Sequence, residues 1–153
     1  MYKAYYNSPI GIVEIVSDEK NIIELSFVEN AAESNLQAAP EILKSALQQV
    51  EEYFQGKRSV FDLKLKAEGT EFQQKVWKSL IEVPYGNTAC YGEIATAVGN
   101  SKASRAVGGA NNKNKIAIII PCHRIVGADG SLTGYAGGLW RKEWLLKHEK
   151  DNR

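Results

Sequence analysis

A cysteine and a histidine stand side by side in residues 119–126, IIPCHRIV, and their types suit nucleophilic chemistry. Cys122 follows Pro121 at the end of an apolar run, and His123 and Arg124 come next. Positive charge beside a thiol lowers its pKa, and the thiolate is the attacking species. We therefore expect a turn that exposes Cys122 as a nucleophile of lowered pKa. His123 can act as its base only if the backbone turns or a water bridges the two, because adjacent strand side chains point to opposite faces.

The other cysteine and histidine carry weaker signals. Cys90 lies in TACYGEI with no histidine nearby, so we expect a structural role, and His148 lies between charged residues of a predicted helix. Two cysteines and two histidines at these spacings predict neither a disulfide framework nor a zinc site. No metal or cofactor is expected. The alternative for Cys122 itself is that it is a small buried apolar residue, as most lone cysteines are.

The first part of the chain predicts a small lobe of sheet and helix. GIVEIVS (residues 11–17) and NIIELSFV (residues 21–28) flank a polar turn and read as a hairpin. Residues 41–54 place apolar side chains on one helical face. VFDLKL, residues 60–65, alternates and predicts a further strand.

The second part predicts helices around the candidate nucleophile. Thr70 is expected to cap a helix whose apolar residues recur every three or four positions. Two short helices, at residues 91–99 and 101–111, suggest a helix-turn-helix, with Ser101 capping its second helix. The apolar residues 116–120 predict a strand, and a glycine-rich loop leads to a last helix in RKEWLLKHEK.

The second helix of the pair is unusually smooth. It contains two adjacent glycines, each of which costs about 1 kcal/mol relative to alanine inside a helix. Small side chains let another surface approach closely, either a neighbouring helix or the floor of a DNA groove. Arg105 is the one long cation in the middle of this helix, and it could occupy the space that a displaced base leaves.

Charge is distributed unevenly along the chain. Residues 1–76 carry eight basic and twelve acidic side chains, whereas residues 77–153 carry eleven and six. The second part is therefore the one suited to an anionic partner, although so small an excess also arises on an ordinary solvated surface. The sequence shows no signal peptide, and its longest aliphatic run is too short to span a bilayer. We expect a cytoplasmic protein.

Several motifs in order resemble the O6-alkylguanine-DNA alkyltransferases. IPCHRIV is preceded by GTEFQQKVW, VPYGNTACYGEIA and RAVGGAN, and it is followed by GYAGG and KEWLLKHE. The resemblance implies an α/β (α+β) fold, with a ribonuclease H-like sheet-plus-helix lobe at residues 1–66. A mainly helical domain with a DNA-binding helix-turn-helix would follow at residues 67–153.

The resemblance also implies a direct, irreversible repair reaction. An alkyl group would move from guanine O6 in double-stranded DNA to Cys122, and O4-methylthymine is a second candidate substrate. His123 would be the base, acting through a water, and Glu149 would hold His123. Asn114 would brace the turn before the active loop, and Tyr91 would donate its hydroxyl to the leaving guanine.

In such proteins a monomer binds the minor groove and flips the base into a pocket. Arg105 would be the finger that enters the base stack. The other residues implied in DNA contact are Lys102, Ala103, Ser104, Ala106 and Gly108. Those implied in the base pocket are Pro121, Ile125, Tyr135 and Ala136. Two alternatives stay open, a lesion-binding module without chemistry and a cysteine hydrolase built on Cys122 and His123.

Overall fold

Two units make up the chain in the computed structural model, which describes residues 1–34 and 36–153. The first unit is Met1–Ala67 and the second is Glu68–Arg153. Each has its own secondary structure and buried residues.

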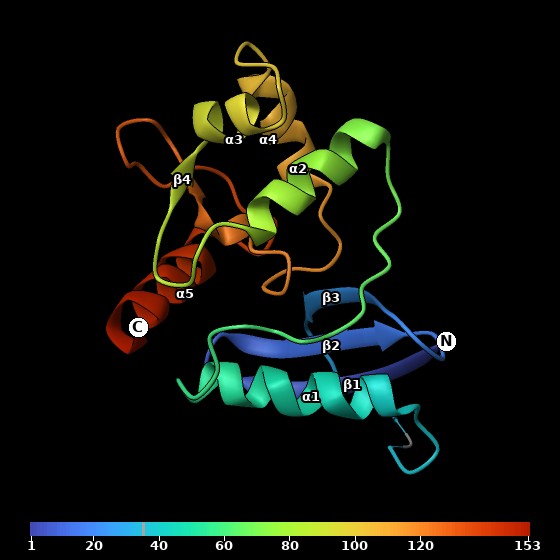
Figure 1. Ribbon diagram of the computed structural model, residues 1–153. Coiled ribbons are helices and arrows are strands. Elements are labelled where there is room, and N and C mark those ends of the chain that lie inside the picture. The colour runs from blue at the N-terminus through green and yellow to red at the C-terminus, as the bar shows by residue number, and fades with distance from the viewer. Residues whose placement is uncertain (35) are drawn as a thin grey trace. The chain divides into compact units, whose positions relative to one another are not determined.

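The first unit is an antiparallel sheet covered by one helix. Strands β1 (Tyr2–Ser8), β2 (Gly11–Ser17) and β3 (Ile22–Val28) pair in that order, and α1 (Glu41–Phe54) runs along the sheet (Figure 1). The predicted hairpin and helix are confirmed. The core forms because alternate strand residues and one helical face are apolar and fully buried. It includes Ala4, Val13, Ile15, Leu25, Leu43, Ala46 and Val50.

The predicted strand at residues 60–65 is wrong. Only Leu65 of this segment forms a bridge, a parallel one with Ile22. The amide side chain of Gln49 on α1 instead pairs with the backbone of Asp62, donating to its carbonyl at 3.1 Å and accepting from its N–H at 2.9 Å. A side chain therefore takes the place of a neighbouring strand.

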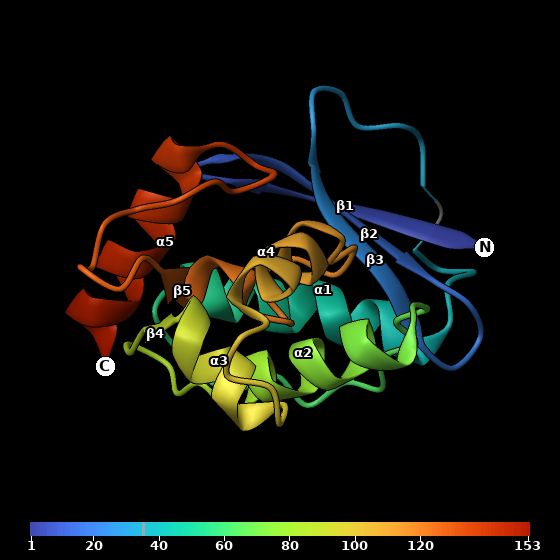
Figure 2. The same ribbon diagram turned by 90° about the horizontal axis from the view of Figure 1, so that it is seen from above.

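The second unit is mainly helical. Helices α2 (Glu71–Ile81), α3 (Tyr91–Ala97) and α4 (Ser104–Asn112) lie together, with α5 (Leu139–Asn152) to one side (Figure 2). Thr70 caps α2 as predicted, because its hydroxyl accepts from Gln73 N–H while the Gln73 side chain accepts from Thr70 N–H. None of the helices in the described part of the chain has the length and apolar composition that crossing a membrane requires.

The helix pair α3–α4 is present, but its second helix starts later than expected. Gly99 has a φ of 91° directly after the C-cap Val98, a left-handed conformation that glycine adopts readily. Ser101 does not cap α4. Asn100 accepts a hydrogen bond from Lys102 N–H instead, and this turn delays the helix to Ser104.

Residues 116–120 form a buried turn and not the strand that their composition predicts. Ile118 has a φ of 70°, which breaks an extended conformation. Asn114 satisfies the backbone of the turn, because its side chain accepts from Ile116 N–H at 3.0 Å and donates to Ile120 O at 2.9 Å. The turn leads into the 3₁₀ helix η1 (Cys122–Arg124) and then β5 (Ile125–Val126), which pairs in parallel with β4 (Ala89–Cys90).

Candidate active site around Cys122

Cys122 is the first residue of η1, and its side chain is buried. Only 6% of its surface is exposed, so the expected exposed thiol is not present. The cause is the turn at residues 116–120, which folds into the interior. Cys122 N–H donates to Ile120 O at 2.8 Å, and the Asn111 amide donates to Cys122 O at 3.4 Å.

The thiol of Cys122 has a raised pKa, the opposite of the predicted direction. Burial raises it, because the charged thiolate loses its solvation. A hydrogen bond from the Asn114 side chain and the positive charge of Lys142 lower the pKa, but they do not outweigh burial. The resting thiol is therefore protonated, and a base has to remove its proton before it can attack.

His123 follows Cys122 directly, and its ring contacts Glu149. The side chains of both residues are fully buried, and His123 Nε2 lies 2.6 Å from a Glu149 carboxylate oxygen. Among the described residues, Nδ1 has no hydrogen-bond partner. Burial lowers the pKa of His123, and although Glu149 raises it, the net shift is downward. The imidazole is therefore a neutral base at neutral pH.

Arg124 binds the same carboxylate. Its Nε donates to Glu149 Oε1 at 2.8 Å and its Nη2 to Oε2 at 3.1 Å, while Nη1 donates to the Val83 carbonyl at 2.8 Å. Burial alone would raise the pKa of Glu149, but hydrogen bonds and charge from His123 and Arg124 lower it far below its ordinary value. The sequence suggested that Arg124 would act on the thiol. Its direct contacts are with Glu149 instead.

Lys142 is a site residue that sequence reasoning missed. It is fully buried, and its ammonium donates to the Thr133 carbonyl at 3.1 Å and lies 3.5 Å from the Thr133 hydroxyl. That hydroxyl is 2.5 Å from the hydroxyl of Tyr91. The sequence could have indicated Lys142 through helical spacing. Lys142, Leu145 and Glu149 are three and four positions apart and therefore share one face of α5, which is its buried face.

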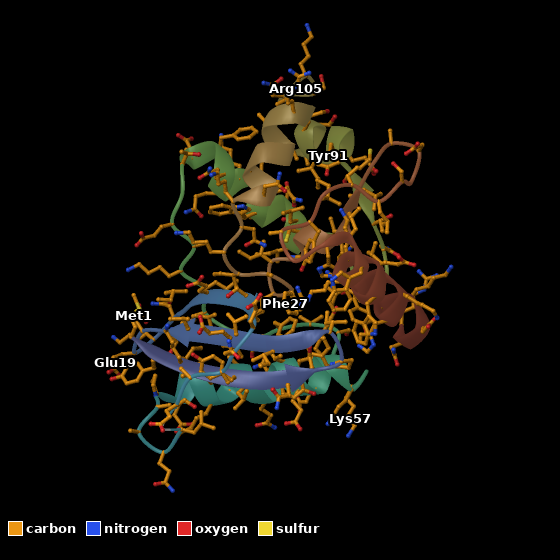
Figure 3. The ribbon with its side chains drawn as sticks, turned by 180° about the vertical axis from the view of Figure 1, so that it is seen from behind. Met1, Glu19, Phe27, Lys57, Tyr91 and Arg105 are labelled. Atoms are coloured by element: carbon orange, nitrogen blue, oxygen red, sulfur yellow. The ribbon has the colours of Figure 1, made fainter. Side chains whose placement is uncertain are left out.

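A hollow of about 530 Å³ lies over α4 on the same unit. It is lined by Tyr91, Ser104, Arg105, Gly108, Gly109, Asn112, Thr133 and Gly134. Cys122 is not among the lining residues. Arg105 is exposed and extends outward beyond Tyr91 (Figure 3).

The two glycines of α4 have different surroundings. A side chain at Gly108 would contact the Tyr91 ring at 3.5 Å, whereas one at Gly109 would meet nothing within 4 Å. Gly109 therefore has no packing reason within the described structure. The other residues predicted to contact DNA lie along this part of the chain, with Lys102 and Ala106 exposed and Ala103 and Ser104 half-buried.

The residues predicted for a base pocket are divided between interior and surface. Pro121 and Ile125 are buried, whereas Ala136 is exposed. The Tyr135 hydroxyl is buried without a hydrogen-bond partner among the described residues, and burial raises its pKa well above its ordinary value. No cluster of His, Cys, Asp and Glu suited to a metal ion occurs in residues 1–34 and 36–153.

Comparison with known proteins connects this site to a family. Residues 71–151 match the family described as 6-O-methylguanine DNA methyltransferase, DNA binding domain, and residues 1–67 match its ribonuclease-like domain. A methylated-DNA–protein-cysteine methyltransferase of Methanosarcina acetivorans is 50% identical over 153 residues, covering 97% of this chain and 98% of the relative. One from Mycobacterium tuberculosis is 45% identical over 147 residues, covering 94% of this chain and 89% of the relative.

Solved structures agree with the sequence matches. The crystal structure of the Mycobacterium tuberculosis O6-methylguanine methyltransferase is 42% identical, with a TM-score of 0.87 over 99% of this chain and 94% of that one. The Mycobacterium tuberculosis OGT in complex with DNA is 43% identical, with a TM-score of 0.89 and the same coverage. The expected fold class is confirmed, and the chain belongs to the 6-O-methylguanine DNA methyltransferase family.

Proposed function

We propose that this protein repairs DNA by accepting the alkyl group of O6-alkylguanine on the sulfur of Cys122. The observation that carries the proposal is a buried thiol beside a histidine whose second ring nitrogen is held by Glu149. This arrangement gives a nucleophile, a base and a group that orients the base. It lies within the residues that match the DNA-binding domain of the family.

The reaction is a single displacement. The thiol proton passes to Nδ1 of His123 through a water, and the sulfur attacks the alkyl carbon. The S–C bond forms as the bond from carbon to guanine O6 breaks. The leaving guanine accepts a hydrogen bond from the Tyr91 hydroxyl and takes up one proton, so that the proton lost by the thiol and the proton gained by guanine balance.

Asn114 supports this step from the preceding turn. Its side chain bonds the turn backbone and lowers the pKa of the Cys122 thiol. The thiolate is therefore stabilised by a group that is already in place before DNA arrives. Such preorganised donors cost no rearrangement at the moment of reaction.

DNA binds across α4 in this proposal. The glycine-rich surface approaches the minor groove, Arg105 enters the base stack, and the flipped base uses the hollow beside Tyr91 to reach a pocket formed with Tyr135, Ala136, Pro121 and Ile125. Support comes from the exposed Arg105, the open surface at Gly109 and the position of Tyr91 in the hollow. Because the Tyr91 hydroxyl now contacts Thr133, that hydrogen bond is exchanged when guanine enters.

Each molecule reacts once. The product is a thioether, which thiol exchange does not reverse. Only one other cysteine is present, and Cys90 caps α3 through contacts with Glu93. We further propose that the protein acts as a monomer in the cytoplasm, which sedimentation of the free and DNA-bound forms and fractionation of cells would test.

The direct test uses a duplex that carries O6-methylguanine with a labelled methyl group. Wild-type protein should take up one label per molecule and gain the mass of one methyl group at Cys122. The Cys122→Ala variant should take up none while still binding the duplex. Uptake by Cys122→Ala, or repeated turnover by wild type, would contradict the proposal, and binding without any uptake would indicate a lesion-binding module.

A further inference from the structure

We propose that Arg124 is a positioning residue that keeps His123 uncharged, and so able to accept a proton, by binding both oxygens of Glu149. The inference deepens the proposed alkyl transfer and rests on it for its kinetic readout. Arg124 acts here through Glu149 and does not touch the reacting atoms.

Arg124 and Glu149 form a buried, paired ion contact, which we call the Arg124–Glu149 clamp. The Arg124 side chain is 8% exposed and that of Glu149 is not exposed at all. Two guanidinium nitrogens donate to the two carboxylate oxygens, and the third donates to the Val83 carbonyl on another segment. The guanidinium also lies 5.7 Å from the centre of the Tyr85 ring. A planar guanidinium matches a carboxylate in this way, whereas an ammonium does not.

The carboxylate therefore has several partners besides the histidine. Gly86 N–H donates to Glu149 Oε1 at 3.3 Å, in addition to Arg124 and the contact with His123. A buried carboxylate whose main partner is an imidazole favours the imidazolium, because opposite charges attract strongly where water is excluded. Neutralisation by Arg124 weakens this effect.

Of the charged groups that face His123, Glu149 favours the imidazolium, whereas Arg124 and Lys142 disfavour it, and the remaining titratable groups are neutral. Glu149 and Lys142 face it from α5, and Arg124 and the Cys122 thiol belong to its own 3₁₀ helix. Tyr85 and Tyr135 interact electrostatically with Glu149, and both hydroxyls are held protonated, with pKa values raised by burial. One carboxylate thus stands against two cations, an arrangement that disfavours a third positive charge on His123.

The proton transfer from Cys122 requires an uncharged His123, and the Arg124–Glu149 clamp meets this requirement. An imidazolium cannot take the thiol proton, so a His123 that is charged at rest would leave Cys122 without a base. Glu149 has to orient the ring without charging it. Arg124 allows this, because it fixes both carboxylate oxygens and offsets their charge.

The kinetic test measures single-turnover alkyl transfer to Cys122 as a function of pH. In Arg124→Met the acid limb of the rate profile should move up by one pH unit or more, with at least a tenfold loss near pH 6 and less than a threefold loss near pH 8.5. Arg124→Lys, which keeps the charge but not the paired hydrogen bonds, should show a smaller upward movement. Arg58→Met, which removes the arginine of an ion pair with Glu52 in the first unit, should behave as wild type.

A spectroscopic readout separates this role from simple support of the fold. Nitrogen NMR of the His123 ring should show a neutral imidazole in wild type, and an imidazolium at the same neutral pH in Arg124→Met. A uniform loss of rate at every pH with unchanged ring titration would overturn the inference. If Arg124→Met does not fold, a ring titration in Arg124→Lys identical to wild type would do the same. If wild type transfers no alkyl group, the proposed function fails while the ring titration still tests Arg124.

Discussion

Opposing effects act on the pKa of the Cys122 thiol. Burial is the larger one and keeps the sulfur protonated, while Asn114 and Lys142 favour the thiolate. Because the thiolate is the form that reacts with oxidants and electrophiles, a protonated resting thiol is the less reactive form. In the proposed reaction, His123 is the base that burial of the thiol makes necessary.

Removing the buried ammonium should raise the thiol pKa further. In Lys142→Gln we expect alkyl transfer at pH 7.5 to slow by roughly threefold to tenfold, because a pKa rise of one unit reduces the thiolate fraction tenfold. The rate should recover toward that of wild type as the pH is raised. Single-turnover rates across pH measure this effect.

Lys147 provides the matched control for this change. It lies on the same helix but is exposed, and its ammonium pairs with Asp151 at 2.8 Å. Lys147→Gln should leave the rate profile unchanged. An equal loss in the two variants, or a loss in Lys142→Gln that does not depend on pH, would show that Lys142 acts only on stability.

At the scale of elements, helix α4 combines a packed face with an open one. Val107 and Ala110 are buried, the Trp77 ring nitrogen donates to Ala110 O at 2.9 Å, and Gly108 lies against Tyr91. Gly109 lies on the open side, where an added methyl group would meet nothing. A glycine there lowers helix stability without any gain in packing, which fits a surface kept flat for a partner.

Gly109→Ala should therefore separate stability from DNA binding. Alanine should stabilise the folded protein by about 0.5–1 kcal/mol, because it restricts the unfolded chain and has room in the helix. Affinity for duplex DNA should nevertheless fall at least threefold, because the methyl group prevents close approach to the groove. Thermal unfolding and DNA titration at fixed salt measure the two effects.

Alkyl transfer from free O6-benzylguanine is the control for Gly109→Ala. It should proceed at the wild-type rate, since the small molecule does not need the flat helical surface. A gain in stability with unchanged DNA affinity would mean that DNA does not approach α4 at this position.

The sequence predicted helix ends correctly where residues close together in the chain determine them. Thr70 and Gln73 form the capping box that starts α2, and Gly99 ends the turn after α3, both through nearest neighbours in the chain. The strand predicted for residues 116–120 was wrong, because the side chain of Asn114, just outside this run, hydrogen-bonds their backbone in a turn. Composition cannot reveal such a competitor for an apolar segment, and for the same reason it could not decide between an exposed Cys122 and the buried alternative.

At the scale of the whole molecule, the site makes stability depend on pH at both ends. The folded-state pKa values of His123 and Glu149 lie below their ordinary values, so their contributions are present above those values and are lost as pH falls. The decline begins below about pH 6.5, the ordinary value for histidine. The folded-state pKa of Cys122 is raised, so its contribution is present below the ordinary value near 9.0 and is lost as pH rises through the folded-state value.

Partly buried tyrosines also contribute to the alkaline limb, so the part that belongs to the Cys122 sulfur is isolated by substitution. Above pH 9 the free energy of unfolding of wild type should fall more steeply than that of Cys122→Ala, by up to about 1.4 kcal/mol per pH unit while only the unfolded thiol is ionised. Urea unfolding from pH 7 to 11 gives the difference between the two proteins. Parallel curves would mean that the thiol ionises equally easily in the folded and unfolded states, contrary to its burial.

The short parallel pairing of β4 with β5 fixes the placement of Tyr91 relative to Cys122. Ala89 and Cys90 pair with Ile125 and Val126, so the backbone just before Tyr91 is tied to the backbone just after Arg124. The segments that carry Tyr91 and Cys122 are thus aligned with each other by strand pairing within the folded chain. Under the proposed function, these two side chains are therefore in place before the substrate arrives.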